Sequence, residues 1–182
     1  MLSSHPVPRT RITVPHRRKD LVSRERLIAL LDELIEKKLI LVAAPAGYGK
    51  TTLLLDYTTH STLPVCWYSI NALDSEPHRF VANLVEAIAL RFPEFGQQTR
   101  AVLSGGQSPV DNEYLAAVLI NDIYEHITEH FIIVLDDYHY VNDNSQIRTF
   151  MNRFIQEADE NCHILITSRT LVSFPALPFL RT

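Results

Sequence analysis

One segment of the sequence, residues 44–51, combines residue types that bind phosphate; it reads APAGYGKT. It matches the pattern G-x-x-x-x-G-K-S/T, with alanine in place of the first glycine. In this pattern a run of backbone N–H groups wraps around a phosphate and leads into the N-terminus of a helix. Gly47 and Gly49, two of only five glycines in the chain, allow the backbone to approach the phosphate closely. We therefore predict a phosphate-binding loop; the alternative is a chance turn between a strand and a helix.

The side chains that follow the glycines suit a nucleotide and its metal ion. Lys50 is expected to reach the β- and γ-phosphates, and the Thr51 hydroxyl to ligate Mg²⁺. Thr52, in the first turn of the following helix, is placed to contact the α-phosphate. The loop contributes a predicted cofactor-binding set of Ala46, Gly47, Tyr48, Gly49, Lys50, Thr51 and Thr52.

A pair of acids, Asp136 and Asp137, ends the apolar run FIIVLDD at 131–137. Parallel sheets bind ligands at the carboxyl ends of their strands, so Asp136 is predicted to hold Mg²⁺ in the Walker B role. Asp137 is expected beside the γ-phosphate, where it orients or deprotonates the attacking water. The alternative is a pair of acids that only caps a turn.

An arginine, Arg169, follows the apolar segment CHILITSR at 162–169. At the end of a strand next to the loop, its guanidinium is suited to donate two hydrogen bonds to the γ-phosphate. We predict Asp137, Lys50 and Arg169 as the catalytic residues. The alternative for Arg169 is an ion pair with a surface carboxylate.

A second motif, H-x-x-E-H at His126, Glu129 and His130, matches the spelling of inverted zinc peptidases. It falls at the end of a predicted helix, where histidines also suit the helix dipole, and no third ligand is evident. We therefore do not predict a zinc site there.

Hydrophobic patterning predicts the elements that must position these residues. Short, continuously apolar runs are typical of buried parallel strands, and amphipathic stretches are typical of surface helices. The predicted strands are 39–44, 64–70, 131–137 and 162–169, and the predicted helices are 23–38, 50–60, one that starts at 75–77, 113–128 and 145–158. Segment 92–112 is predicted as loop with at most one short helix. This alternation indicates an α/β fold with a mainly parallel sheet.

Composition describes an ordinary globular chain. The 182 residues are 46% hydrophobic and 21% charged, with a net charge of −4, which argues against a disordered segment. Two separated cysteines, Cys66 and Cys162, make neither a disulfide framework nor a zinc motif, so a reducing, cytoplasmic setting is expected. The apolar runs are far shorter than the ~20 residues that span a bilayer, and the N-terminus has no apolar signal region. We expect no membrane association.

The first 22 residues form a basic lead-in segment with five cations among the first twenty residues and one acid. Such an arm can neutralise nucleic-acid phosphates, but the chain as a whole is acidic. We favour a solvated segment laid over the surface of the domain at 23–182.

With APAGYGKTT, VLDDYH and ITSR considered together, the sequence resembles the nucleotide-binding domain of MalT-like transcriptional regulators. These are STAND-class P-loop ATPases of the large ATP-binding LuxR type. The resemblance covers nearly the whole chain. Val22-Ser23-Arg24 looks like the family's pre-loop motif, so Arg24 is expected to contact the nucleotide, and residues 66–88 are similar to the family's second strand and its helix.

The resemblance implies a switch that binds ATP or ADP with Mg²⁺. It implies an inactive ADP-bound monomer, self-association through the ATPase domain when ATP and an inducer are bound, and slow ATP hydrolysis that resets the state. In the family a separate C-terminal helix-turn-helix domain binds DNA, so no direct DNA binding by this chain is expected.

The family's fold is a three-layer P-loop NTPase sandwich with a sheet of order 5-1-4-3-2. Only four strands are predicted here, and the fifth is expected beyond Thr182. Strand 39–44 is then an open edge that can pair with another chain. Residues 23–182 are interpreted as a STAND nucleotide-binding domain truncated from a longer regulator, although a short gene product that has lost its output domains fits the sequence as well.

Two other functions use the same residues. A small P-loop kinase would transfer phosphate to a metabolite, but it needs an acceptor domain and an arginine-rich lid, and the arginines here are scattered. A nucleotide-independent interaction module would carry a degenerate loop. Nucleotide binding separates the interaction module from both the ATP/ADP switch and the kinase.

Overall fold

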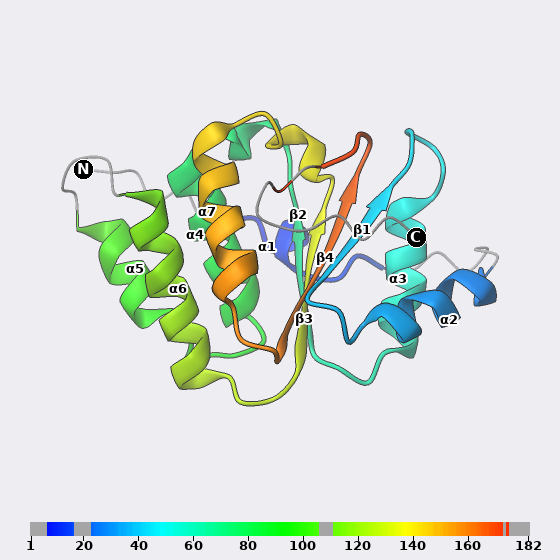
Figure 1. Ribbon diagram of the computed structural model, residues 1–182, viewed down its shortest axis with the longest axis horizontal. Coiled ribbons are helices and arrows are strands. Elements are labelled where there is room, and N and C mark those ends of the chain that lie inside the picture. Colours follow the sequence, from blue (N-terminus) through cyan, green and yellow to red (C-terminus); the bar gives the residue numbers. More distant parts are fainter. Residues whose placement is uncertain (1–6, 17–22, 106–110, 173, 175–182) are drawn as a thin grey trace.

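Parallel β-strands form the centre of the structure, a computed structural model that describes residues 7–16, 23–105, 111–172 and 174 (Figure 1). The sheet has four strands in the order β1-β4-β3-β2. Their bounds are Leu39–Ala43 for β1, Val65–Ser69 for β2, Phe131–Asp136 for β3 and Cys162–Ser168 for β4. The predicted parallel order is confirmed, and β1 lies at an edge of the sheet in the described part of the chain.

Strand β3 shows how the sheet separates two hydrophobic cores. Phe131, Ile133 and Leu135 belong to the larger core, whereas Ile132 and Val134 belong to the smaller one. Successive side chains of a strand point to opposite faces of its sheet. A strand with five consecutive apolar residues must therefore be covered on both faces, and all six residues of β3, including Asp136 at its end, are buried.

Two groups of helices cover the two faces of the sheet (Figure 1). One face carries α2 and α3, and the other carries α4, α5, α6 and α7. The bounds are Glu25–Leu34 for α2, Lys50–His60 for α3, Pro77–Ala89 for α4, Gln97–Ser104 for α5, Asn112–His126 for α6 and Ser145–Glu157 for α7. Three short elements complete the fold: α1 (Arg9–Ile12) and the 3₁₀ turns η1 (Ala72–Ser75) and η2 (Tyr138–Tyr140). The predicted three-layer P-loop NTPase sandwich is confirmed, and within the described ranges no helix is long and apolar enough to cross a membrane.

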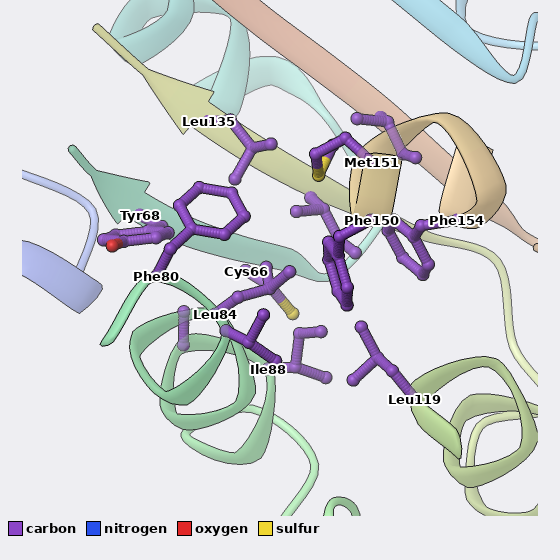
Figure 2. Close-up of a cluster of buried hydrophobic side chains, with 14 of the residues drawn as sticks. Cys66, Tyr68, Phe80, Leu84, Ile88, Leu119, Leu135, Phe150, Met151 and Phe154 are labelled. Atoms are coloured by element: carbon purple, nitrogen blue, oxygen red, sulfur yellow. The ribbon is translucent and has the colours of Figure 1, made fainter. Parts of the chain in front are cut away.

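Aromatic rings fill the larger core between the sheet and helices α4 and α7 (Figure 2). The ring of Phe80 meets that of Phe150 edge to face, with centroids 6.3 Å apart, and that of Tyr138 with centroids 6.5 Å apart. Such pairs contribute about 0.5–1.5 kcal/mol beyond their buried area. Tyr138 directly follows Asp136 and Asp137, so this packing fixes the chain that leaves the carboxyl end of β3.

The predicted helix 23–38 is too long, because α2 ends at Leu34. Lys37 and Lys38 lie outside it, and the backbone carbonyl of Lys38 accepts a hydrogen bond from Ile164 N at 2.8 Å. Lys38 is thus already aligned with β4 as the chain enters β1. Pairing in the sheet, a contact distant in sequence, overrides the local helical pattern.

Segment 92–112 contains one short helix, the eight-residue α5, as the prediction allowed. Gly96 precedes α5 with a φ of +89°. The buried carboxylate of Asp122, on α6, accepts hydrogen bonds from the backbone N of Thr99 at 2.7 Å and from its Oγ1 at 2.6 Å. A cap supplied from a distant helix is invisible to local sequence patterns. Residues 106–110 lie outside the described residues.

The expectation of a solvated lead-in is wrong at Arg11 and Ile12. Ile12 is buried in the larger core. Arg11 donates from Nε and Nη2 to the Ser69 carbonyl at 3.1 and 2.8 Å, and it forms an ion pair with Asp74. Asp74 is fully buried and also accepts from Asn83 Nδ2 at 2.9 Å. Because a buried carboxylate requires partners, the lead-in contributes to the fold at this point. Residues 1–6 and 17–22 of the segment lie outside the described residues.

Candidate nucleotide-binding site

The predicted phosphate-binding loop joins the carboxyl end of β1 to the N-terminus of α3. Gly47 and Gly49 have φ values of +84° and +74°, a region that side chains with a Cβ rarely adopt. Gly49 is the N-cap of α3, and its cap has no side-chain hydrogen bond in the described part of the chain. A Cβ added at Gly47 would meet no atom within 4 Å, so the loop opens there. Backbone N–H groups at an open helix N-terminus are suited to bind an anion.

Lys50 lies across the base of this loop. Its side chain is largely buried, and its ammonium donates to the carbonyl oxygens of Ala44 at 2.7 Å and Pro45 at 3.1 Å. The loop therefore holds the positive charge of Lys50 against its own first carbonyl groups. Thr52 follows in the first turn of α3 and is partly exposed.

Thr51, in the first turn of α3, meets Asp136, the last residue of β3, at the carboxyl end of the strand. The Thr51 Oγ1 lies 3.0 Å from each carboxylate oxygen of Asp136, although the two residues are 85 positions apart. Asp136 is buried, and burial raises the pKa of its carboxyl; the hydrogen bond from Thr167 opposes that shift. A hydroxyl and a carboxylate that converge in this way form the kind of oxygen-only donor set that Mg²⁺ prefers.

Asp137 leaves β3 in a left-handed conformation, with a φ of +62°. Its backbone N donates to Thr167 Oγ1 at 2.9 Å, and its carboxylate lies 3.6 Å from Nδ1 of His139. Burial lowers the pKa of His139, and the charge of Arg169 also lowers it, while Asp137 acts in the opposite direction. The Asp137 carboxylate thus faces the imidazole of His139, and its backbone is bonded to Thr167.

The two predicted arginines occupy different positions. Arg24 donates from Nη1 to the Tyr48 carbonyl at 3.0 Å, and a Cβ added at Gly49 would lie 3.0 Å from its Nη2. It is therefore part of the loop's surroundings. The guanidinium of Arg169 instead lies 6.0 Å from the centre of the Tyr140 ring, at the end of β4. It is near the site, and its γ-phosphate role stays a prediction.

The histidines of the H-x-x-E-H motif have separate partners. His126 Nδ1 lies 2.9 Å from the Asp122 carbonyl, whereas His130 Nδ1 lies 3.0 Å from Nε2 of His163. Among the described residues, no group of three or more His, Cys, Asp or Glu side chains could hold a metal ion.

Sequence reasoning missed one residue of the site, Thr167. Its hydroxyl donates to Asp136 Oδ1 at 2.6 Å and accepts from the backbone N of Asp137. The signal was present in ITSR at the end of a predicted strand. Threonine is common in strands, however, so the sequence did not indicate that this hydroxyl bonds to residues of the site.

A family model described as nephrocystin 3, N-terminal matches residues 18–169, most of the chain. The chain belongs to this family. Among curated relatives, the HTH-type transcriptional regulator MalT of Serratia proteamaculans is 31% identical over 162 residues, which are 89% of this chain and 18% of that protein. MalT of Yersinia enterocolitica is 30% identical over 166 residues, again 89% of this chain and 18% of the relative.

The matches to MalT confirm the resemblance to MalT-like transcriptional regulators. The chain spans under a fifth of the length of these curated relatives. A chain in a structure of Drosophila ORC bound to DNA is similar with a TM-score of 0.49 and 10% identity, over 81% of this chain and 76% of that chain.

Proposed function

We propose that this chain is an ATP/ADP-binding switch domain of a MalT-like transcriptional regulator, in which slow Mg²⁺-dependent ATP hydrolysis resets the state. The observation that carries the proposal is the convergence of Thr51 and Asp136 at 3.0 Å beside an open glycine loop. The two residues lie on different elements, and their meeting is what a metal-bound nucleotide requires.

Each residue of the site has a distinct part in binding. The loop N–H groups and Lys50 hold the phosphates, and Arg24 adds a contact from the start of α2. Thr51 and Asp136 would hold Mg²⁺, which neutralises phosphate charge when bound. Asp137 would orient the attacking water or accept its proton, and Arg169 would hold the γ-phosphate.

The regulatory half of the proposal rests on the relatives, whose printed name is HTH-type transcriptional regulator. A nucleotide can drive a switch only if ATP and ADP bind its two conformations with different affinities. We infer that ADP favours a monomer and that ATP favours self-association. Such a regulator works in the cytoplasm, and DNA binding belongs to another part of the whole protein.

Thermal unfolding with and without nucleotide tests the binding half. At a concentration about 100-fold above Kd, a ligand stabilises a fold by about 2.7 kcal/mol. For a chain of this size that corresponds to a rise in Tm of about 5–10 °C. We expect ADP and ATP to raise the Tm, and Mg²⁺ to increase that rise in the wild type but not in Thr51→Val. No rise with either nucleotide would contradict the proposal.

Sedimentation velocity with Mg²⁺–ADP and with Mg²⁺–ATP tests the switch half. We expect a monomer with ADP and a larger, concentration-dependent species with ATP. Identical sedimentation in the two states at all concentrations, combined with confirmed binding, would leave a nucleotide-binding domain that does not switch through association.

A further inference from the structure

Thr167 lies at the carboxyl end of the central strand β4, between the two acids of the site. It is fully buried. Leu135 pairs with Ile166 in the sheet, so the residues that follow them, Asp136 and Thr167, are neighbours at the end of β3 and β4. Thr167 Oγ1 donates to Asp136 Oδ1 at 2.6 Å and accepts from Asp137 N at 2.9 Å.

A hydroxyl has one donor and two acceptor positions, and this one uses both kinds. Its proton fixes one carboxylate oxygen of Asp136, and its lone pair fixes the backbone of the next residue. A serine can make the same two bonds, whereas a valine of the same shape can make neither. One side chain thus controls both acids at once.

The backbone of Asp137 needs such support. Asp137 is the one non-glycine residue with a positive φ among those that the structure describes. A residue in this region persists only where its surroundings hold it, and such residues concentrate at functional sites. The hydrogen bond from Asp137 N to Thr167 is a direct hold on this conformation. The left-handed turn in turn sets the direction in which the Asp137 carboxylate leaves the strand.

We propose that Thr167 is a positioning residue of the nucleotide site. Its hydroxyl orients Asp136 toward the metal position next to Thr51 and holds the turn that presents Asp137. The metal and water roles of the two acids rest on the proposed function, whereas the hydrogen bonds themselves exist in the protein without a ligand.

Two substitutions separate the hydroxyl from the shape of the side chain. Thr167→Val removes the hydroxyl at nearly constant volume, and Thr167→Ser keeps it. Ser168→Ala is a matched control, because it removes the neighbouring buried hydroxyl of β4, which accepts from Thr170 N at 3.2 Å. Thr167→Ala serves as a second hydroxyl-free variant in case valine does not fold.

Hydrogen exchange of the Asp137 amide, followed by NMR without nucleotide, gives the first readout. Loss of one hydrogen bond predicts exchange about threefold to tenfold faster in Thr167→Val than in the wild type, Thr167→Ser or the control. Unchanged exchange in the valine and alanine variants would overturn the positioning of Asp137, whether or not the domain binds nucleotide.

Calorimetric titration of ADP at several Mg²⁺ concentrations gives the second readout. Removing a partner that orients a metal ligand commonly lowers the affinity for the metal by about 10–100-fold. Thr167→Val is therefore expected to need about 10–100-fold more Mg²⁺ for the same gain in ADP affinity. Thr167→Ser is expected within about threefold of the wild type, since it retains both bonds. A serine variant as impaired as the valine variant, or a valine variant with wild-type Mg²⁺ dependence, would overturn the proposal. A wild type that binds no ADP would instead refute the proposed function, and the exchange readout would still decide the role of the hydroxyl.

Discussion

Replacing Gly96 with alanine tests how the start of α5 packs against α4. Gly96 is the N-cap of α5 and has a φ of +89°. A Cβ built at this position would lie 2.8 Å from Cγ1 of Val85, a fully buried residue of α4. Both the backbone conformation and the space are therefore unfavourable for any residue except glycine.

The cost follows from two separate terms. A non-glycine residue in a left-handed conformation costs about 1–2 kcal/mol, and overpacking a well-packed core costs about 1–3 kcal/mol. Their sum predicts that Gly96→Ala lowers the free energy of unfolding by about 2–5 kcal/mol. Because domains are commonly stable by about 5–15 kcal/mol, the variant should still fold at low temperature.

Urea unfolding of the wild type and of two glycine variants measures this difference. The matched control is Gly105→Ala, because Gly105 ends the same helix in a right-handed conformation and an added Cβ would make only ordinary contacts, 3.4 Å or more from the nearest atoms. The control is expected within about 1 kcal/mol of the wild type, with stabilisation the favoured direction. Since α5 lies on the opposite side of the sheet from α3 and the loop (Figure 1), folded Gly96→Ala should keep wild-type ADP affinity.

The reasoning would be refuted if Gly96→Ala unfolded within about 0.5 kcal/mol of the wild type, a difference typical of neutral surface substitutions. Equal losses in Gly96→Ala and Gly105→Ala would also contradict it. That result would mean that neither the left-handed cap nor the contact with Val85 sets the cost.

Two further predictions concern the edges of the sheet. Arg11→Ala leaves the buried Asp74 without its main cation, so urea unfolding should show a loss of about 3 kcal/mol in the free energy of unfolding. Arg79→Ala is the comparison, because the Nε of Arg79 lies 3.5 Å from the same carboxylate. A loss in Arg11→Ala no larger than the loss in Arg79→Ala would contradict this prediction. Leu41 is 39% exposed on the edge strand β1, so Leu41→Lys should change stability by less than about 1 kcal/mol and reduce any concentration-dependent association seen by light scattering. Unchanged association would exclude the β1 edge as the contact surface.

The sequence was sufficient to predict the site's main pair and the sheet that forms it. Thr51 follows a glycine-containing loop that matches a phosphate-binding pattern, and Asp136 ends a strand whose other five residues are all apolar. Because the carboxyl ends of parallel strands meet at one edge, two local signals 85 residues apart were enough to place these side chains together.

The features that escaped prediction depend on contacts between distant segments. The pair of Arg11 and Asp74 joins residues 63 positions apart, and nothing periodic links them. Gly96 had no assigned role in the sequence, because its need for glycine comes from its φ and from Val85. Thr167 was hidden because its importance depends on two neighbours from β3. In each case the signal is the geometry of the folded chain and not the local residue pattern.

The central claim is that this domain binds nucleotide through the loop that contains Lys50. Isothermal titration of ADP and ATP, with Mg²⁺, into the wild type and Lys50→Ala tests it most directly. Lys37→Ala, a change at an exposed lysine beyond the end of α2, is the matched control. We expect binding to the wild type and the control, and a loss of about tenfold or more in Lys50→Ala, because hydrogen bonds to a charged group contribute about 1.5–3 kcal/mol. A wild type that binds neither nucleotide, or a Lys50→Ala variant that binds as tightly as the wild type, would contradict the account.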